Sequence, residues 1–520
     1  MHELYLWPFY DAVKAGAGST MCSYQRVNNS YGCQNSKTMN GLLKTELGFE
    51  GFVVSDWYAQ HTGVASVNAG LDMVMPNSMY LDVNSFATAI KNGSINSTRL
   101  DDMATRILAT WYRFANLQNP GLNDAEARQA AAEATLFQGA VEGHVLVKNV
   151  NNALPLKKPT VLSLFGYDAP GGINISATSF QLKPNGKLNT QAYTNGKPYT
   201  DLDDLINSAQ VLPAGFAGPE VALNGTLYTG GGSGAITPVS SISPEDAFRN
   251  QAAIDGTTLY TDFTSQNPTI KDPNNPCLVF INSQSSETWD RSTLADIYSD
   301  TLVTNVASKC KNTMVIIHSA GIRLVDRWID HPNITAVIYA NLPGQYSGTS
   351  LTEIIYGRQS PSGRLPFTQN VTPRFAFGYG LTYSNFSYSG LQMSANDSAV
   401  TSSSPPGTVG GIAAEGGTTS LHDIIATVSV SVRNTGNVAA AEVAQLYLGI
   451  PGSGVPKVLR GFEKQLIQPG ASVNMTFSLR RRDMSIWDVV RQQWVLPSGA
   501  FNIMVGKSVL DIQLQGTLTL

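Results

Sequence analysis

The sequence predicts an α/β multidomain protein that ends in a β-sandwich. Up to about residue 385, short apolar runs alternate with segments of helical spacing, which is typical of a mainly parallel sheet covered by helices. From Ile424 the pattern changes, and Val428, Val430 and Val432 alternate with polar residues as in half-buried strands. The 520 residues are enough for about two to four domains.

The first region, residues 1–117, alternates strand and helix. Its expected strands are 18–24, 51–57 and 71–75. Ser36 is expected to cap a helix that Gly48 ends, because apolar residues recur between them at helical spacing. A second, strongly amphipathic helix is expected from Thr98. About three strands are present, whereas a closed β/α barrel needs eight.

The second region is expected to form an α/β domain over residues 141–390, after a linker helix region at 118–140. The preceding helix is predicted to run from Asp124 to about Val147. Buried strands are predicted at the apolar runs 161–165, 277–281, 313–317 and 334–340.

Residues 391–420 are rich in Ser, Gly and Pro, which predicts a flexible linker. The last region, 421–520, is predicted to be a β-sandwich of the immunoglobulin or fibronectin III kind. Its strands are expected from 424 and near 442–448, 473–479 and 500–505.

The composition argues against two classes of partner. The net charge is -4, the pI is about 5.9 and only 14% of residues are charged, so neither nucleic acid nor an anionic membrane is implied. No apolar run approaches the roughly twenty residues of a membrane span. A neutral, polar small molecule fits this composition better.

Cysteines and glycosylation motifs indicate the cellular compartment in which the protein is found. Cys22 and Cys33 bracket a short loop, and Cys277 and Cys310 bracket a strand and a helix. Both pairs are disulfide candidates, with buried free thiols as the alternative. Ten Asn-x-Ser/Thr triplets favour secretion, although no signal peptide is recognised at the N-terminus.

The stretch 52–57 carries the most informative chemistry. Four apolar or small residues lead into Asp56 and Trp57, as at the end of a buried parallel strand, where barrel enzymes place their catalytic groups. A carboxylate beside a flat indole suits an enzyme that cleaves sugars. The alternative is an Asp56 that only closes a turn.

Several motifs occur in one order along nearly the whole chain. They include Met21-Cys22-Ser23-Tyr24, Tyr31-Gly32-Cys33, Ser55-Asp56-Trp57, Gly70-Leu71-Asp72-Met73, Phe377-Gly378-Tyr379-Gly380 and Ile486-Trp487-Asp488. The set resembles glycoside hydrolase family 3, and within it the fungal secreted β-glucosidases. The resemblance implies the C-terminal part of a (β/α)8 barrel, then an α/β sandwich domain, then a fibronectin III-like domain. It also implies that the N-terminal part of the barrel is absent.

Retaining glycosidases use two carboxyls about 5 Å apart, one as nucleophile and one as acid/base. The resemblance assigns Asp56 as the nucleophile and Glu287 as the acid/base. Thr288 departs from the glycine that relatives carry at its position, and Asp290 is the rival carboxylate for the acid/base role.

The resemblance further places Met21, Tyr24, Trp57 and Ser233 at the sugar, with core packing as the alternative for the first three. Asp72 is interpreted as a buried hydrogen-bonding residue. No cluster has metal-ligand spacing, so neither a metal nor another cofactor is expected.

The expected function is a retaining exo-β-glucosidase that removes terminal non-reducing β-D-glucosyl units from cello-oligosaccharides and β-glucosides. Two alternatives stay open: a β-xylosidase specificity, and an inactive remnant with a glycan-associated or structural role. The expected partner is a small oligosaccharide or glucoside, with a homodimer as an open alternative to the monomer, and the expected location is extracellular.

Overall fold

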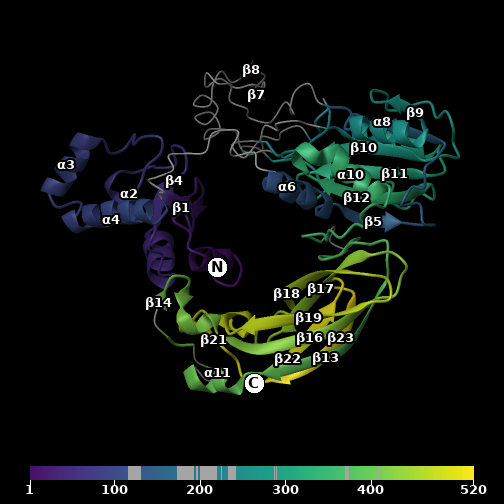
Figure 1. The fold of residues 1–520 in the computed structure, drawn as a ribbon. Coiled ribbons are helices and arrows are strands. Elements are labelled where there is room, and N and C mark those ends of the chain that lie inside the picture. The colour runs from purple at the N-terminus through teal and green to yellow at the C-terminus, as the bar shows by residue number, and fades with distance from the viewer. Residues whose placement is uncertain are drawn as a thin grey trace.

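The computed structural model describes most of the chain in three bodies (Figure 1). The described residues are 1–114, 130–171, 193–194, 197–198, 220–223, 225–231, 242–285, 287, 290–368, 374–403, 406–407, 409–411 and 413–520. None of the helices within these ranges is both long enough and apolar enough to cross a membrane. The three bodies are an N-terminal segment, a six-stranded α/β body and a β-sandwich.

The N-terminal segment is built around a parallel pair of strands, β1 (Ser19–Cys22) and β4 (Phe52–Ser55). Its other elements are α1 (Trp7–Lys14), β2 (Arg26–Val27), β3 (Ser30–Tyr31), η1 (Gly32–Gln34), η2 (Lys37–Glu46), α2 (Val64–Asn68), α3 (Val83–Lys91) and α4 (Ser97–Phe114). These elements confirm the strand and helix alternation expected for this region.

Two details of this segment differ from the expectations. The third strand is reduced to a single bridge between Val54 and Met73, because the Asp72 side chain takes the backbone N–H of Val53 that a paired strand would use. Ser36 makes no side-chain cap on η2. Asn35 accepts the N–H of Thr38 in its place.

The α/β body contains all four predicted strands. They are β6 (Val161–Phe165), β10 (Cys277–Ser283), β11 (Thr313–Ser319) and β12 (Ile334–Asn341). Two more strands complete the order β5-β12-β11-β10-β6-β9, namely β5 (Val145–Asn149) and β9 (Thr258–Asp262). Only β5 runs antiparallel to its neighbour. A disulfide joins Cys277 to Cys310 beside this sheet.

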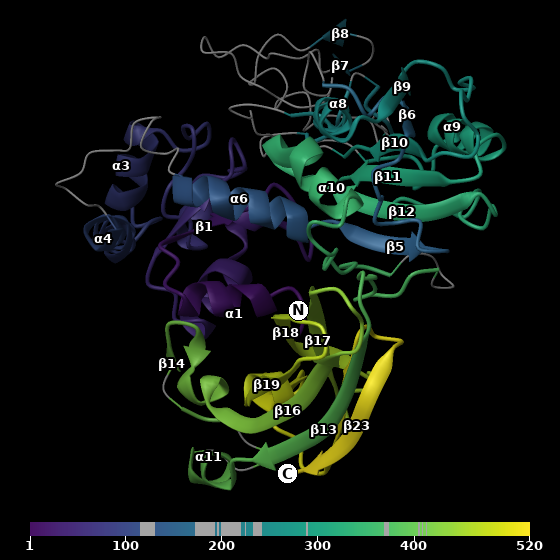
Figure 2. The same cartoon turned by 45° about the vertical axis from the view of Figure 1, so that its right-hand side comes forward.

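Helices cover both faces of the six-stranded sheet. They are α6 (Ala130–Glu142), α8 (Pro244–Asp255), α9 (Ile297–Ala307) and α10 (Ser347–Ile355), with η3 (Gly344–Tyr346) before the last. Leu278 and Phe280 pack into the core beneath α8 and α10, whereas Val279 and Ile281 pack with α9, which is the period-two pattern of a doubly covered strand. α6 lies on the side that faces the N-terminal segment (Figure 2).

The helix expected to continue to Val147 ends at Glu142. Gly143 follows it, and the β-branched Val145 and Val147 then pack as part of β5. Residues 118–129 of the expected linker helix region lie outside the described residues.

The C-terminal body is a β-sandwich of two antiparallel sheets. One has the order β13-β16-β19, and the other has the order β18-β17-β22-β23. The strands are β13 (Phe386–Ala395), β16 (Ile424–Asn434), β17 (Ala440–Gly449), β18 (Val458–Ile467), β19 (Ser472–Arg480), β22 (Ala500–Gly506) and β23 (Ile512–Thr519). Smaller elements are α11 (Asp397–Ser403), β14 (Ala413–Ala414), β15 (Gly417–Thr418), η4 (Thr419–His422), η5 (Arg482–Met484), β20 (Ile486–Asp488) and β21 (Gln493–Val495), and β7 (Tyr193–Thr194) and β8 (Lys197–Pro198) form a separate hairpin.

The segment expected as a linker, 391–420, begins inside the sandwich. Residues 391–395 belong to β13, because Gln392 to Ala395 pair with β16 and extend that sheet. Their polar residues alternate with half-buried Leu391 and Met393, which pack on the core. The strand is an edge strand, where polar residues are common.

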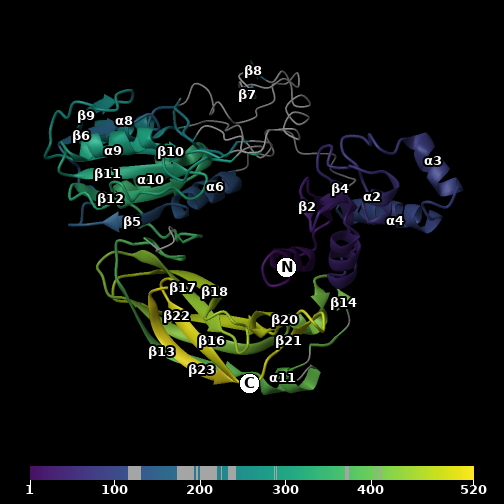
Figure 3. The same ribbon diagram turned by 180° about the vertical axis from the view of Figure 1, so that it is seen from behind.

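The sandwich contacts both other bodies (Figure 3). Against the N-terminal segment, Asp11 binds Arg482 at 2.7 Å and Arg480 at 3.0 Å, and His2 stacks on Trp487. Against the loop that follows the α/β body, Glu442 binds Arg364 at 3.0 Å. Both contacts use buried arginine or glutamate side chains, so the sandwich holds its two neighbours by charge as well as by apolar packing.

Replacing Asp11 with alanine should destabilise the contact with the sandwich. Arg482 is fully buried, and without Asp11 its charge loses its closest partner, so we expect a loss of about 1.5–3 kcal/mol. The midpoint of thermal unfolding should fall accordingly. Asp488→Ala is the matched control, because its ion pair with the exposed Arg491 is worth at most about 1 kcal/mol. Equal midpoints for the two variants would show that the pair of Asp11 and Arg482 contributes no more to stability than an exposed ion pair does.

Candidate active site

Asp56 directly follows β4 at the carboxyl edge of the β1–β4 pair. Its backbone N–H donates to the carbonyl of Cys22 at the end of β1, at 3.1 Å. A disulfide joins Cys22 to Cys33 and closes the intervening loop. The carboxyl ends of the two parallel strands therefore meet where Asp56, Trp57 and the loop that carries Tyr24 emerge.

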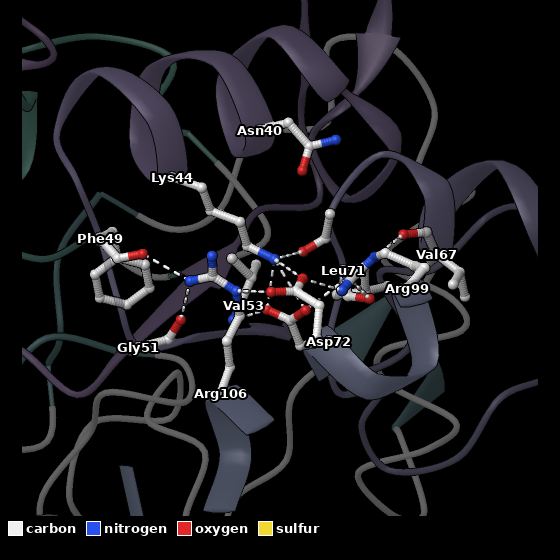
Figure 4. A network of polar contacts seen from close by, with 12 residues as sticks. Asn40, Lys44, Phe49, Gly51, Val53, Val67, Leu71, Asp72, Arg99 and Arg106 are labelled. Atoms are coloured by element: carbon white, nitrogen blue, oxygen red, sulfur yellow. Dashed lines mark hydrogen bonds and ion pairs between the residues drawn. The ribbon is translucent and has the colours of Figure 1, made fainter. Parts of the chain in front are cut away.

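A buried charge cluster holds β4 in place (Figure 4). Asp72 accepts the N–H of Val53 at 2.8 Å, and its carboxylate also binds Lys44 at 2.9 Å and Arg99 at 2.6 Å. The side chain of Asp72 is fully buried. Burial lowers the pKa of Lys44, whereas its hydrogen bond to Asp72 raises that pKa. The interpretation of Asp72 as a buried hydrogen-bonding residue is therefore confirmed.

The cluster continues to the start of β4. Asp102 binds Arg99 at 2.6 Å and Arg106 at 2.8 Å. Arg106 in turn donates to the carbonyls of Phe49 and Gly51, at 2.6 and 3.0 Å. The backbone is thus fixed at residues 49, 51 and 53, just before Asp56. No local sequence pattern distinguishes a cation that turns inward from one that faces solvent, so the sequence alone does not identify Lys44, Arg99 or Arg106 as members of this cluster.

Tyr24 lies near both of the predicted catalytic acids, Asp56 and Glu287. Burial raises the pKa of its hydroxyl; the negative charge of Asp56 and a hydrogen bond with Asp56 raise it further, and the charge of Glu287 adds to the effect. One phenol therefore lies within electrostatic reach of both acids, although the N-terminal segment carries Asp56 and the α/β body carries Glu287.

Trp57 lies beside Asp56, and its backbone N–H donates to the Asp56 carboxylate at 2.6 Å. Its indole N–H is buried and has no hydrogen-bond partner among the described residues. Tyr58 packs edge-on to the indole at 6.3 Å between ring centroids. Trp57 thus combines an apolar face with an unused donor next to the carboxylate.

Met21 lies on β1 and pairs with Val54, two residues before Asp56. Its side chain is 60% exposed, so the alternative of core packing is wrong for this residue. It lines a hollow of about 340 Å³ with Leu6, Phe9 and Val53. Tyr24, Asp56 and Trp57 do not line that hollow.

Glu287 lies in the loop after β10, and the glycine-rich segment holds this loop. The N–H of Gly231 donates to Ser285 at 2.9 Å, and the N–H of Glu287 donates back to Gly231 at 3.4 Å. Glu287 and Asp290 are both exposed. The predicted residue Ser233 lies outside the described residues, and so does Thr288.

Arg291, next along this loop, donates to the carbonyl of Ile322 at 2.8 Å, and burial lowers the pKa of its guanidinium. In the part of the chain that the structure describes, no three His, Cys, Asp or Glu side chains lie together in a way that could hold a metal ion.

Family models match three stretches of the chain in order. Residues 1–110 match the glycosyl hydrolase family 3 N terminal domain, 144–383 the family's C-terminal domain, and 442–509 a fibronectin type III-like domain. "Probable beta-glucosidase M" from Aspergillus fumigatus is 46% identical over 100% of this chain and 70% of its own length. The chain belongs to glycosyl hydrolase family 3. The resemblance to this family is confirmed, and the chain is a glycoside hydrolase by membership.

Solved structures of family 3 enzymes agree with this assignment. A β-glucosidase from Chaetomella raphigera matches with a TM-score of 0.80 and 36% identity, over 100% of this chain and 75% of that one. A β-D-glucoside glucohydrolase from Trichoderma reesei matches with a TM-score of 0.82 and 34% identity, over 100% and 74%. The predicted order of a barrel portion, an α/β domain and a fibronectin III-like domain is therefore confirmed.

Replacing Asp72 with asparagine should strongly destabilise the N-terminal segment. The change leaves Lys44 and Arg99 buried beside a neutral group, and breaking such a buried pair costs about 3–5 kcal/mol. Urea denaturation measures the loss. Asp101→Asn, an exposed acid on the same helix as Arg99, should change stability by no more than about 0.5 kcal/mol. Similar values for the two variants would show that the cluster does not hold β4.

The hydroxyl of Tyr24 should ionise well above the usual pKa of about 10. The raised pKa keeps the phenol neutral as the pH rises through 10, because burial and the nearby acids oppose a further negative charge. Ultraviolet difference titration against Tyr24→Phe isolates this group. Asp56→Asn should move the pKa down toward 10, since it removes the strongest charge effect. An unchanged pKa of Tyr24 in Asp56→Asn would show that the Asp56 carboxylate does not interact with the Tyr24 hydroxyl.

Proposed function

We propose that this family 3 member is a retaining exo-β-glucosidase that hydrolyses terminal non-reducing β-D-glucosyl residues of cello-oligosaccharides and other β-glucosides. One observation carries the proposal: Tyr24 is hydrogen-bonded to Asp56 and lies near enough to Glu287 that the charges of both acids raise the pKa of its hydroxyl, although the two acids come from different bodies. Retaining hydrolysis needs two such carboxyls on either side of the scissile bond.

Asp56 is the proposed nucleophile. The fixed backbone before it and the N–H of Trp57 hold its carboxylate, and the neutral Tyr24 donates a hydrogen bond to it. A carboxylate held in this way can attack the anomeric carbon without first reorganising. The Trp57 ring offers an apolar face to the sugar, and its unused indole N–H is a donor for a hydroxyl group.

Glu287 is the proposed acid/base. It protonates the leaving oxygen as the bond to the aglycone breaks, and it then removes a proton from the water that releases glucose from Asp56. Its exposed position suits this second step, because water must reach it.

The names of the relatives support the choice of glucose. "Probable beta-glucosidase M" proteins of several Aspergillus species and "Beta-glucosidase cel3A" of Pyricularia oryzae align with 99–100% of this chain. A β-xylosidase specificity remains the alternative among enzymes.

We also propose that the protein is secreted and glycosylated. Two disulfides within the chain suit an oxidising compartment. Several sequon asparagines are exposed, as acceptors must be; they are Asn28, Asn92, Asn96, Asn385, Asn396 and Asn474.

Hydrolysis of 4-nitrophenyl β-D-glucoside tests the assignment of both acids. Asp56→Asn should lower kcat/KM by at least about 10³-fold, because it removes the nucleophile. Glu287→Gln should lower it by about 10²–10⁴-fold. Asp290→Asn separates the rival carboxylate, and it should retain most of the activity.

Three outcomes would contradict the proposal. A larger loss of kcat/KM in Asp290→Asn than in Glu287→Gln would assign the acid/base role to Asp290. Faster hydrolysis of 4-nitrophenyl β-D-xyloside would favour the xylosidase alternative. A folded chain that hydrolyses neither substrate would support the inactive remnant.

A further inference from the structure

A second buried polar cluster lies at the carboxyl edge of the six-stranded sheet. Its members are Asp168 just after β6, Asn282 on β10 and His318 on β11, and all three are fully buried. The three strands are adjacent in the sheet. Parallel strands bring their carboxyl ends to one edge, so side chains far apart in the sequence meet there.

Both oxygens of the Asp168 carboxylate are occupied. Oδ2 pairs with Nδ1 of His318 at 2.5 Å. Oδ1 accepts the side-chain amide of Asn282 and the backbone N–H of Leu227, each at 2.8 Å. The cluster is closed to solvent, so none of its members can touch a substrate. Any effect that it has on catalysis must pass through the backbone residues that it holds.

These residues are 220–223 and 225–231, which lie at the carboxyl edge of the sheet. Asn282 exchanges two hydrogen bonds with the backbone of Ala222, at 2.9 and 2.8 Å, and Leu227 donates to Asp168. Four residues after Leu227, Gly231 pairs with Ser285 and Glu287. The cluster therefore fixes both partners of this pairing: the glycine-rich segment through Leu227, and the Glu287 loop through Asn282 on β10.

We propose that Asp168 is a positioning residue for Glu287, acting through Leu227 and Asn282 to set the loop on which the acid/base lies. This inference rests on the proposed function. Its consequence is that losing the Asp168 carboxyl group impairs proton donation more than it impairs nucleophilic attack.

The test compares two substrates that differ only in the leaving group, phenyl β-D-glucoside and 2,4-dinitrophenyl β-D-glucoside. Phenoxide is a poor leaving group and needs a proton from the acid, whereas dinitrophenoxide departs without one. Asp168→Ala removes both acceptors and should therefore reduce kcat/KM for the phenyl substrate at least about tenfold more than for the dinitrophenyl substrate, since small misplacements of catalytic groups are costly. Glu287→Gln gives the reference pattern in the same direction.

Asp255→Ala is the matched control. Asp255 is also a buried aspartate of this body, but it ends α8 near the start of β9, at the opposite edge of the sheet. It should affect the two substrates equally. Asn282→Ala supplies an independent test if Asp168→Ala does not fold, and circular dichroism and thermal unfolding verify the fold of each variant.

Equal losses on the two substrates in a folded Asp168→Ala or Asn282→Ala chain would overturn the inference. So would a leaving-group effect of the same size in Asp255→Ala. These outcomes leave the proposed function standing. If the unmodified chain hydrolyses neither substrate, or if Glu287→Gln shows no preference for the activated one, the proposed function fails first.

Discussion

The carboxylate of Asp72, buried between two cations, is the constraint on which the first half of the site depends. Taking three charged groups out of water is costly, and the cost is offset only when their geometry and remaining hydrogen bonds are satisfied. Here Asp72 also accepts the N–H of Val53 within β4, and Arg106, which joins the cluster through Asp102, donates to the carbonyl of Gly51 just before β4. The position of Asp56 follows from this arrangement, because Asp56 is the first residue after the fixed strand. The burial of these charges is unfavourable in itself, but their contacts fix β4 and therefore the direction in which the loop with Asp56 leaves it.

The second half of the site depends on how two bodies meet. Asp56 and Glu287 are more than two hundred residues apart in the sequence, and each is held by polar contacts within its own body. The sandwich contacts both bodies, through Asp11 on one side and Glu442 on the other. It therefore takes part in the geometry of the site, although none of the proposed catalytic residues comes from it.

The sequence predicted those parts of the fold that have a local signal. The four central strands of the α/β body are continuous apolar runs, and all four are found. β9, with the sequence Thr-Leu-Tyr-Thr-Asp, is an edge strand without such a run, and β13 ends with Leu391 to Ala395, which form the start of the segment predicted as a linker. Asp56 stood out because its motif is contiguous. Asp168 and His318 did not, since they are 150 residues apart and only the order of the strands brings them together.

The supports of Glu287 all lie between β6 and η3. Asp168, Asn282, His318 and the glycine-rich segment belong to one continuous stretch of chain, and that stretch lies inside the match to the family's C-terminal domain, 144–383. The acid/base loop and the groups that orient it are therefore inherited as a single block. In chimaeras between family members, a junction before residue 144 and another after residue 383 would transfer that block intact, whereas a junction between β6 and β10 would separate the loop from Asp168.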